Sequence, residues 1–227
     1  SPTPAFDVSE SVWGYRSLEK TPLDYFGLVP SRDMGIDLKG KFDDKGILKY
    51  WVKLGNNSGS KPETDKYKRY YGSLQFTPSK NFTVIVDGDY NTLPPKAGLN
   101  NSAFTGDIFV NFNKGKIFSV AAEVFIKSQQ NNYKPSGATS PETQNGLGFS
   151  FWAKSMFTDN IGIVGRFDMW DPNTNENAKN DKQNLIIGAI DFKVMPNFDI
   201  MPGIEIHTLE GKDHDDITPR ITFYWIF

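Results

Sequence analysis

The sequence predicts an all-β protein, a transmembrane antiparallel β-barrel, on three observations. From residue 33 to the end, apolar and polar residues alternate with a period of two in eleven segments, which is the pattern of strands with one apolar and one polar face. Short turns and long polar loops alternate between these segments. The chain then ends inside an aromatic strand, on Phe227. Together these features are typical of a barrel that spans an outer membrane.

The predicted strands are each about as long as the ~9–11 residues that cross a bilayer at a tilt. In the sixth of them, Phe118, Val120 and Ala122 alternate with Ser119 and Glu123. The same parity places the even-numbered residues of 34–54 toward lipid and the charged residues toward water. In chain order the strands are residues 33–42, 48–54, 72–77, 82–89, 104–112, 118–127, 147–153, 161–169, 186–194, 198–207 and 220–227.

The connections between the strands are of two kinds. Short ones carry the Asp, Asn, Gly and Pro residues that tight hairpins need, at 43–46, 78–81, 113–115, 157–160 and 195–197. Long polar ones lie at 56–69, 91–103, 128–145, 171–183 and 210–218. We expect the long loops at the extracellular rim and the short turns opposite. A soluble β-sandwich also alternates apolar and polar residues, but it does not explain this fivefold alternation of connection length.

Composition excludes several other classes of protein. The 227 residues contain no Cys, which rules out a disulfide scaffold and thiol catalysis. The balance of 25 Lys and Arg against 27 Asp and Glu argues against a nucleic-acid partner. No stretch reaches the ~20 apolar residues of a membrane helix. We expect a single domain over residues 1–227, and the start at Ser1-Pro2 indicates a processed or trimmed product.

No constellation of residues predicts an enzyme or a cofactor. His207 and His214 are the only histidines, and neither has a nucleophile and a carboxylate arranged around it in the sequence. The stretch 212–216 is rich in Asp and contains His214. It is interpreted as a solvated loop tip, with a site for a divalent cation that bridges lipid phosphates as the alternative. We therefore predict no catalytic residue, no cofactor and no resident metal.

The charged row of the strands is predicted to line a water-filled lumen. It carries both signs, so the sequence predicts no strong charge preference. Lys39, Lys41, Lys49 and Lys53 form a basic stripe, which would face an acidic stripe of Asp87, Asp89 and Asp107; ion pairs between neighbours on the wall are the alternative. The predicted pore-lining and constriction residues are Arg16, Arg32, Asp33, Asp37, Lys39, Lys41, Lys49, Lys53, Asp87, Asp89, Asp107, Glu123, Arg166, Asp168 and Arg220.

The last seven residues, Ile-Thr-Phe-Tyr-Trp-Ile-Phe, resemble the C-terminal strand of bacterial outer-membrane proteins. The resemblance implies that the assembly machinery of that membrane recognises Phe223, Trp225 and Phe227. Residues 13–20 (WGYRSLEK) and 30–40 (PSRDMGIDLKG) resemble a segment of the phosphate-selective porins of the O and P type.

This second resemblance implies a barrel of sixteen strands, of which the chain holds the last eleven or twelve. It also implies that residues 10–32 fold into the pore and narrow it, with Arg16 and Arg32 near Asp33 or Asp37. Closure has two alternatives. Either twelve strands close on themselves, with residues 4–9 paired to the last strand, or strands absent from this chain complete the wall. The prolines at 2 and 4 favour the second.

The expected function is that of an outer-membrane porin of the Gram-negative envelope, which lets small hydrophilic solutes or ions diffuse through a water-filled pore. The alternative is a non-conducting barrel with a structural or surface-binding role, such as an adhesin or an assembly component. The expected partners are outer-membrane lipid, lipopolysaccharide and the assembly machinery. The expected protein partner is either further copies of the chain in a homotrimer or another chain that supplies missing strands. No nucleic acid is expected.

Overall fold

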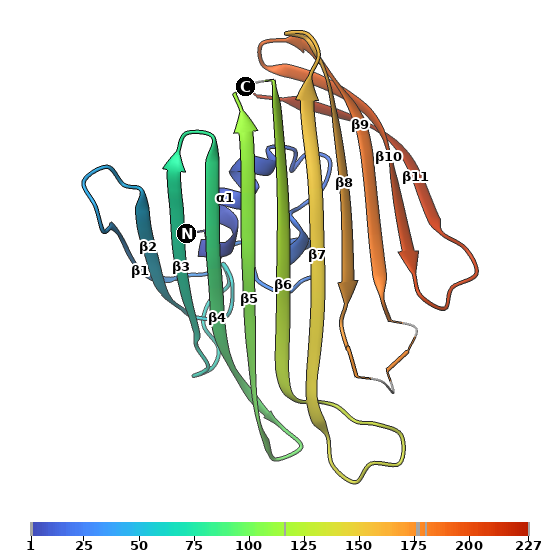
Figure 1. The fold of residues 1–227 in the computed structure, drawn as a ribbon. Coiled ribbons are helices and arrows are strands. Elements are labelled where there is room, and N and C mark those ends of the chain that lie inside the picture. The colour runs from blue at the N-terminus through green and yellow to red at the C-terminus, as the bar shows by residue number, and fades with distance from the viewer. Residues whose placement is uncertain (1, 116, 176–177, 180, 227) are drawn as a thin grey trace.

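A computed structural model describes residues 2–115, 117–175, 178–179 and 181–226. It is one antiparallel sheet of eleven strands whose spatial order is the chain order, so the all-β fold and the strand count are confirmed (Figure 1). The strands are β1 (Gly35–Lys41), β2 (Leu48–Gly55), β3 (Arg69–Ser79), β4 (Phe82–Lys96), β5 (Leu99–Lys114), β6 (Phe118–Tyr133), β7 (Glu142–Met156), β8 (Ile161–Asp171), β9 (Gln183–Met195), β10 (Phe198–Leu209) and β11 (Asp216–Trp225).

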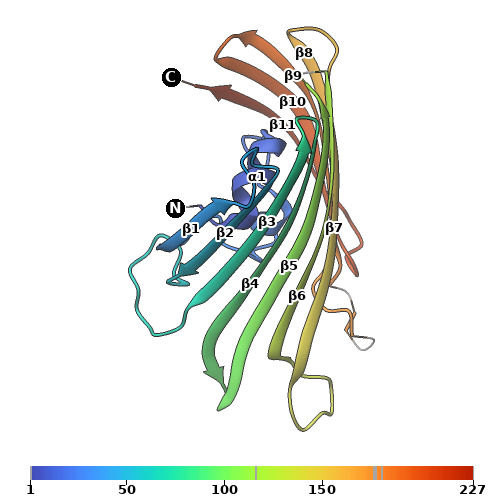
Figure 2. The ribbon, with the colours of Figure 1, turned by 60° about the vertical axis from the view of Figure 1, so that its left-hand side comes forward.

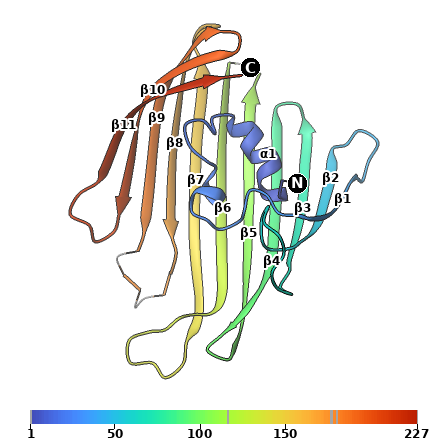
Figure 3. The same ribbon diagram turned by 180° about the vertical axis from the view of Figure 1, so that it is seen from behind.

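The sheet is strongly curved, and residues 2–34 lie in its hollow (Figures 2 and 3). We call residues 2–34 the N-terminal segment. It contains α1 (Pro4–Trp13) and the short α2 (Pro22–Tyr25). The alternative in which residues 4–9 form a strand is therefore wrong. Pro4 suits the first turn of a helix, and Gly14, at φ 71°, ends it by accepting the left-handed conformation.

The two faces of the sheet follow the predicted parity. On the convex face, Ile36, Leu38 and Val52 are 77%, 62% and 52% exposed, whereas Lys53 points into the hollow and is buried. In the middle of the sheet, Ile108 and Val124 are cross-strand partners and are both about half exposed. The convex face is therefore an apolar surface, and the charged row lies on the concave face. Within the described residues, neither helix has the length and hydrophobicity of a membrane-spanning helix.

The five predicted short turns join the strands at one end of the sheet, and the other connections join them at the opposite end (Figure 1). One predicted loop is wrong: residues 91–103 are almost entirely strand, because β4 runs to Lys96 and β5 starts at Leu99. Ala97 and Gly98, at φ 50° and 79°, form the turn between them. Tyr90 and Phe104 pair across this hairpin and extend the apolar convex face toward the loop end. The sequence did not indicate this extension, because residues 91–103 are mostly polar.

The sheet is open. Within the described residues, β1 pairs only with β2 and β11 pairs only with β10. The twelve-strand closure, in which residues 4–9 pair with the last strand, is therefore not what the structure shows. The observed fold is a partial barrel whose hollow is occupied by the N-terminal segment.

Candidate functional site: the N-terminal segment in the hollow of the sheet

Apolar packing holds the N-terminal segment against the wall at two places. Around the end of α1, Trp13 packs edge-on against Trp152 of β7, with ring centroids 5.3 Å apart. Both indole side chains are at most 2% exposed. This first cluster also contains Leu18 of the segment and residues of β4, β5, β6, β8, β9 and β10. The burial of such large side chains contributes roughly 1.5–3 kcal/mol each.

The second cluster lies nearer the loop end of the strands. Phe6, Leu23 and Val29 of the segment pack there with Tyr71, Phe125 and Trp170 of the wall, among others. Phe125 stacks on Trp170 with centroids 5.7 Å apart. The wall makes room for this stack with a glycine, since a Cβ at Gly148 would lie 2.0 Å from the Phe125 ring. The concave face is therefore not a uniformly polar lumen wall.

Four basic side chains of the wall donate hydrogen bonds to backbone carbonyl oxygens of the N-terminal segment. Lys154 Nζ lies 2.6 Å and 3.0 Å from the carbonyl oxygens of Val12 and Trp13, which are the C-terminal end of α1, where positive charge is favourable. The other three donors are Arg69 to Leu28 O at 3.0 Å, Arg220 to Leu18 O at 2.8 Å, and Arg166 to Lys20 O. We call Arg69, Lys154, Arg166 and Arg220 the clamp residues.

Acidic residues of the wall hold the three arginines among the clamp residues in place. Arg166 forms a forked pair with Asp168, in which both side chains are fully buried. Asp168 also accepts a hydrogen bond from Ser150 at 2.7 Å. Arg69 pairs with Asp89 at 2.6 Å. These charged side chains therefore orient the N-terminal segment and do not face open water.

In one contact the N-terminal segment is the hydrogen-bond donor and the wall is the acceptor. Tyr15 donates its hydroxyl hydrogen to Asp191 Oδ2 at 2.8 Å. Burial, together with this carboxylate, raises the pKa of Tyr15 above its usual range. The phenol therefore stays protonated and keeps its hydrogen bond at any ordinary pH.

The predicted acidic stripe is on the concave face but is covered. Asp87 and Asp107 are cross-strand partners, and with Glu123 they are 7%, 6% and 2% exposed. The prediction that these residues, with Asp89, Arg166 and Asp168, line water is therefore corrected: the parity was right, but the N-terminal segment and its side chains shield this part of the wall.

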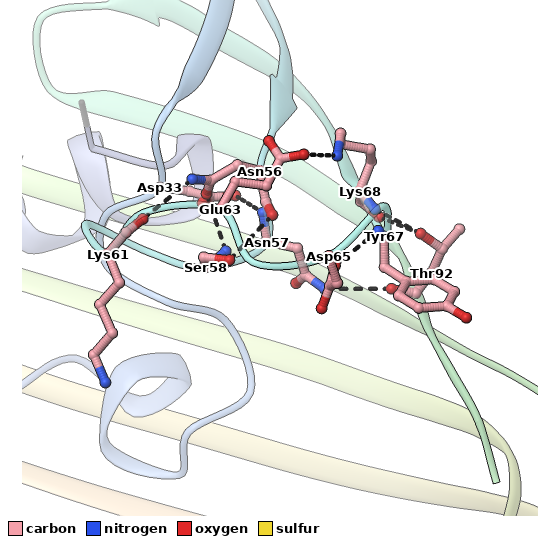
Figure 4. A network of polar contacts seen from close by, with 10 residues as sticks. All are labelled: Asp33, Asn56, Asn57, Ser58, Lys61, Glu63, Asp65, Tyr67, Lys68 and Thr92. Carbon is pink, nitrogen blue, oxygen red and sulfur yellow. Dashed lines mark hydrogen bonds and ion pairs between the residues drawn. The ribbon is translucent and has the colours of Figure 1, made fainter.

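Asp33 is also an anchor and not a pore residue. Its buried carboxylate accepts hydrogen bonds from the backbone N–H of Asn57 and Gly59 at 3.2 Å and 3.1 Å, and from the Tyr71 hydroxyl at 2.8 Å. Figure 4 shows Asp33 beside Asn57 in the loop that follows β2. Farther along this loop, Lys68 N–H donates to the Thr92 hydroxyl at 2.7 Å. The network fixes the end of the N-terminal segment and the loop 56–68 to each other.

The four lysines of the predicted basic stripe differ in their burial. Lys53 is buried and pairs with Asp37 at 3.3 Å, and Asp37 also accepts a hydrogen bond from Trp51 Nε1 at 2.8 Å. Lys39 lies over the Trp51 ring, 3.3 Å from its centroid. Lys41 and Lys49 are exposed cross-strand partners of like charge. The inner face of the β1–β2 hairpin is therefore open to solvent at its turn end, around Lys41 and Lys49, whereas that of the central strands is covered.

A large hollow remains between the N-terminal segment and the open side of the sheet. It has a volume of about 920 Å³, and its lining includes Asp7, Glu10, Arg16, Arg32 and Tyr224. Arg16 pairs with Glu10 at 2.5 Å and with Asp24 at 3.0 Å. The expectation that Arg16 lies beside Asp33 or Asp37 is therefore wrong, because its ion-pair partners are Glu10 and Asp24. Arg32 is exposed at the edge of the hollow.

The remaining predicted residues lie on β10 and β11. Arg220 pairs with Glu205 at 2.8 Å in addition to its clamp contact. Phe223 and Trp225 are 65% and 63% exposed on the convex face, as parity predicts, and Phe227 lies outside the described residues. His207 is half-buried against Tyr25. In the described part of the chain, no group of three or more His, Asp or Glu side chains is arranged to hold a metal ion.

Sequence reasoning missed Trp13, Trp152, Lys154 and Arg69 as the residues that fix the segment. Trp13 carried a usable signal, because Ala5, Phe6, Ser9 and Trp13 recur at helical spacing and are all buried. Lys154 and Arg69 carried none, since their acceptors are backbone carbonyl groups that every residue has.

Comparisons with known proteins leave the family open. No protein-family model matches the chain, and no curated protein matches it. One match among solved structures is a NanC porin in a rhombohedral crystal form, with a TM-score of 0.49, 8% identity, and coverage of 85% of this chain and 92% of that one. A likeness of this size carries no argument about function. The resemblance to the phosphate-selective porins is not supported by these comparisons and remains a prediction from residues 13–40.

Proposed function

We propose that the chain forms most of the wall of an outer-membrane porin, which lets small hydrophilic solutes or ions diffuse passively through a water-filled passage. The observation that carries the proposal is the apolar outer surface of the sheet. Its convex face exposes an apolar side chain at almost every outward position, from Ile36 to Trp225. A soluble monomer rarely exposes a continuous apolar surface of this size. Lipid is the surrounding in which such a face is stable.

The passage that we propose runs along the outer side of the N-terminal segment, through the hollow lined by Asp7, Glu10, Arg16 and Arg32. The central wall is excluded as a path because the two apolar clusters and the clamp residues join it to the segment. The segment thus acts as a fixed constriction. Its charged side chains, of both signs, are the ones a passing ion meets, so we expect weak charge selectivity.

A specific observation favours a second function. The N-terminal segment fills much of the hollow with apolar side chains, as a core does. A barrel plugged in this way would be a non-conducting structural or surface-binding protein of the same membrane.

Planar-bilayer recording separates the two functions. The protein is extracted from outer membranes in mild detergent and reconstituted, and its β-sheet content is checked by circular dichroism. Discrete current steps support the porin. A correctly folded preparation without current steps contradicts it and supports the plugged barrel.

A further inference from the structure

The convex face of the sheet carries an apolar groove over β6, β7, β8 and β9, with a volume of about 570 Å³. Each of these four strands is paired on both sides, so the groove does not depend on the outer strands of the sheet. Its walls are outward aromatic and aliphatic side chains, namely Phe118, Val120, Phe151, Ile163, Phe167 and Ile186.

Small residues form the floor of this groove. Ala153 pairs with Gly165, and Gly165 pairs with Gly188, across three neighbouring strands. A Cβ added at Gly165 would meet only the carbonyl oxygen of Ile187, at 3.9 Å. The described part of the chain therefore leaves the floor of the groove uncovered on its outer side.

A second row of glycines on the same face is covered by the protein itself. Gly72, Gly88 and Gly106 pair across β3, β4 and β5. The Phe104 ring would lie 3.6 Å and 3.2 Å from a Cβ at Gly88 and Gly106, so an aromatic ring fills that gap, as is common beside glycines of sheets. The groove over Gly165 has no such ring, and its walls gain contacts only from a molecule outside the chain.

A polar cavity of about 470 Å³ adjoins the groove at the turn end of the sheet. Phe118, Lys154 and Ser155 line both. The cavity is also lined by Lys193 and by the carboxylate of Asp159. Its lining includes three further residues with hydroxyl groups, Tyr15, Ser119 and Thr158. The groove thus leads from an apolar surface to a rim that carries both charges.

The two lysines of this rim cavity each have one N–H group to spare. Lys154 Nζ donates to two carbonyl oxygens at the end of α1, at 2.6 Å and 3.0 Å. Lys193 Nζ lies 3.1 Å and 3.2 Å from carboxylate oxygens of Asp191 and Asp199. Because an ammonium group has three N–H donors, each lysine can still donate to one more acceptor. A phosphate oxygen is a common acceptor for lysine.

We propose that the groove and the rim cavity together bind one zwitterionic phospholipid of the periplasmic leaflet. One acyl chain lies over Ala153 and Gly165, the phosphate accepts hydrogen bonds from Lys154 and Lys193, and the ammonium of the headgroup faces Asp159. The proposal rests on the proposed membrane location, which puts the convex face in lipid and the short turns at the periplasmic rim. It assigns a place and a chemistry to a single lipid, beyond the lipid that surrounds any barrel.

Filling the groove tests the place of the acyl chain. Gly165→Leu puts a side chain into the groove. Gly72→Leu is the matched control on the same face, because a Cβ there meets nothing within 4 Å. The protein is purified in mild detergent, washed free of lipid and titrated with dioleoylphosphatidylethanolamine, and bound lipid is counted by native mass spectrometry. Gly165→Leu should lower the affinity about tenfold, or ~1.4 kcal/mol, and Gly72→Leu should not change it.

Two results of this titration overturn the proposal. One is an equal affinity of Gly165→Leu and the wild type for the phospholipid. The other is a Gly165→Leu protein that keeps its lipid but loses an oligomeric state that the wild type has, since the groove would then be an interface between copies of the chain.

Dioleoylglycerol tests the headgroup site, because it has the same acyl chains and no phosphate. The wild type should bind the phospholipid about tenfold more tightly than dioleoylglycerol, and Lys193→Met, with its β-sheet content checked by circular dichroism, should bind both equally. The absence of a preference in the wild type overturns the proposal without any variant. The outcome is separate from that of the channel: bound phospholipid in a protein that passes no current contradicts the porin alone, and a conducting protein without this lipid site contradicts this proposal alone.

Discussion

The inner face of the central strands and the inner face of the β1–β2 hairpin at its turn end have the same sequence pattern and different surroundings. Both alternate charged with apolar residues. In the centre, Glu123, Arg166 and Asp168 are at most 3% exposed, whereas Lys41 and Lys49 on the hairpin are exposed. Alternation decides which face a side chain takes. What covers that face is decided by the N-terminal segment, more than a hundred residues away along the chain from β7 and β8.

The largest expected effect distinguishes two neighbouring aromatic residues of β7. Trp152 packs against Trp13 beneath the segment, whereas Phe151 lies on the convex face and is 46% exposed. Trp152→Ala should destabilise the protein by about 3–5 kcal/mol and loosen the segment, which should raise single-channel conductance and current noise. Phe151→Ala is the matched control and should change neither. Equal effects of the two variants on thermal unfolding and on current would mean that the segment is not held by this cluster.

Breaking a buried ion pair should be the next most severe change. Arg166→Met leaves Asp168 without its partner in a fully buried position, and such a loss costs about 3 kcal/mol or more. Lys49→Met removes an exposed charge opposite another lysine and should leave the midpoint of denaturant unfolding unchanged or slightly raised. If both variants unfold at the same denaturant concentration, the central charges are as solvated as those of the hairpin.

A smaller effect is expected where the segment joins the loop after β2. Asp33→Asn keeps the shape of the side chain but removes the charge that accepts bonds from Asn57, Gly59 and Tyr71. Such bonds to a charged group are worth about 1.5–3 kcal/mol. The loop 56–68 should therefore be cut faster by protease added to intact cells, while the short turn at 78–81 stays protected. An unchanged cleavage rate would show that the loop is held by other contacts.

The smallest effect concerns the turn of the exposed hairpin. Asp43 accepts hydrogen bonds from the backbone N–H of Leu48 and Ile47 at 2.8 Å and 3.0 Å, and these bonds hold the pKa of Asp43 below its usual 3.8. A lowered pKa stabilises the turn above pH 3.8, and this contribution is lost as pH falls through the lowered value. Amide exchange at 46–48, corrected for intrinsic rates, should accelerate on acidification in the wild type and not in Asp43→Asn.

The wall could be predicted from the sequence because its rule is local. A period of two places Ile36 outward and Lys53 inward whatever lies nearby, and the turn residues at 78–81 and 157–160 mark the strand ends. The hairpin turn at Ala97-Gly98 was missed because polar residues at 91–103 read as a loop, although they extend β4 and β5. There the ladder to neighbouring strands overrode the local propensity.

The site could be predicted only in outline. The resemblance placed residues 10–32 in the pore, and the segment does lie in the hollow of the sheet. The contacts that hold it were out of reach, because Lys154 and Arg220 bind backbone carbonyl oxygens. The sequence likewise predicts Arg166 to be a pore charge, because its hydrogen bond to the Lys20 carbonyl oxygen exists only in the folded protein. Such pairings depend on tertiary geometry and leave no spacing in the sequence.

The most direct test of the account is the accessibility of single cysteines while current flows. Ser11 lines the hollow on the outer side of the N-terminal segment, and Ala121 lies in the first apolar cluster between the segment and the wall. A charged, membrane-impermeant thiol reagent added to the bilayer chamber should reduce the current of Ser11→Cys and leave that of Ala121→Cys unchanged. A block at Ala121→Cys, with no effect at Ser11→Cys, would place the water path between segment and wall and contradict the account.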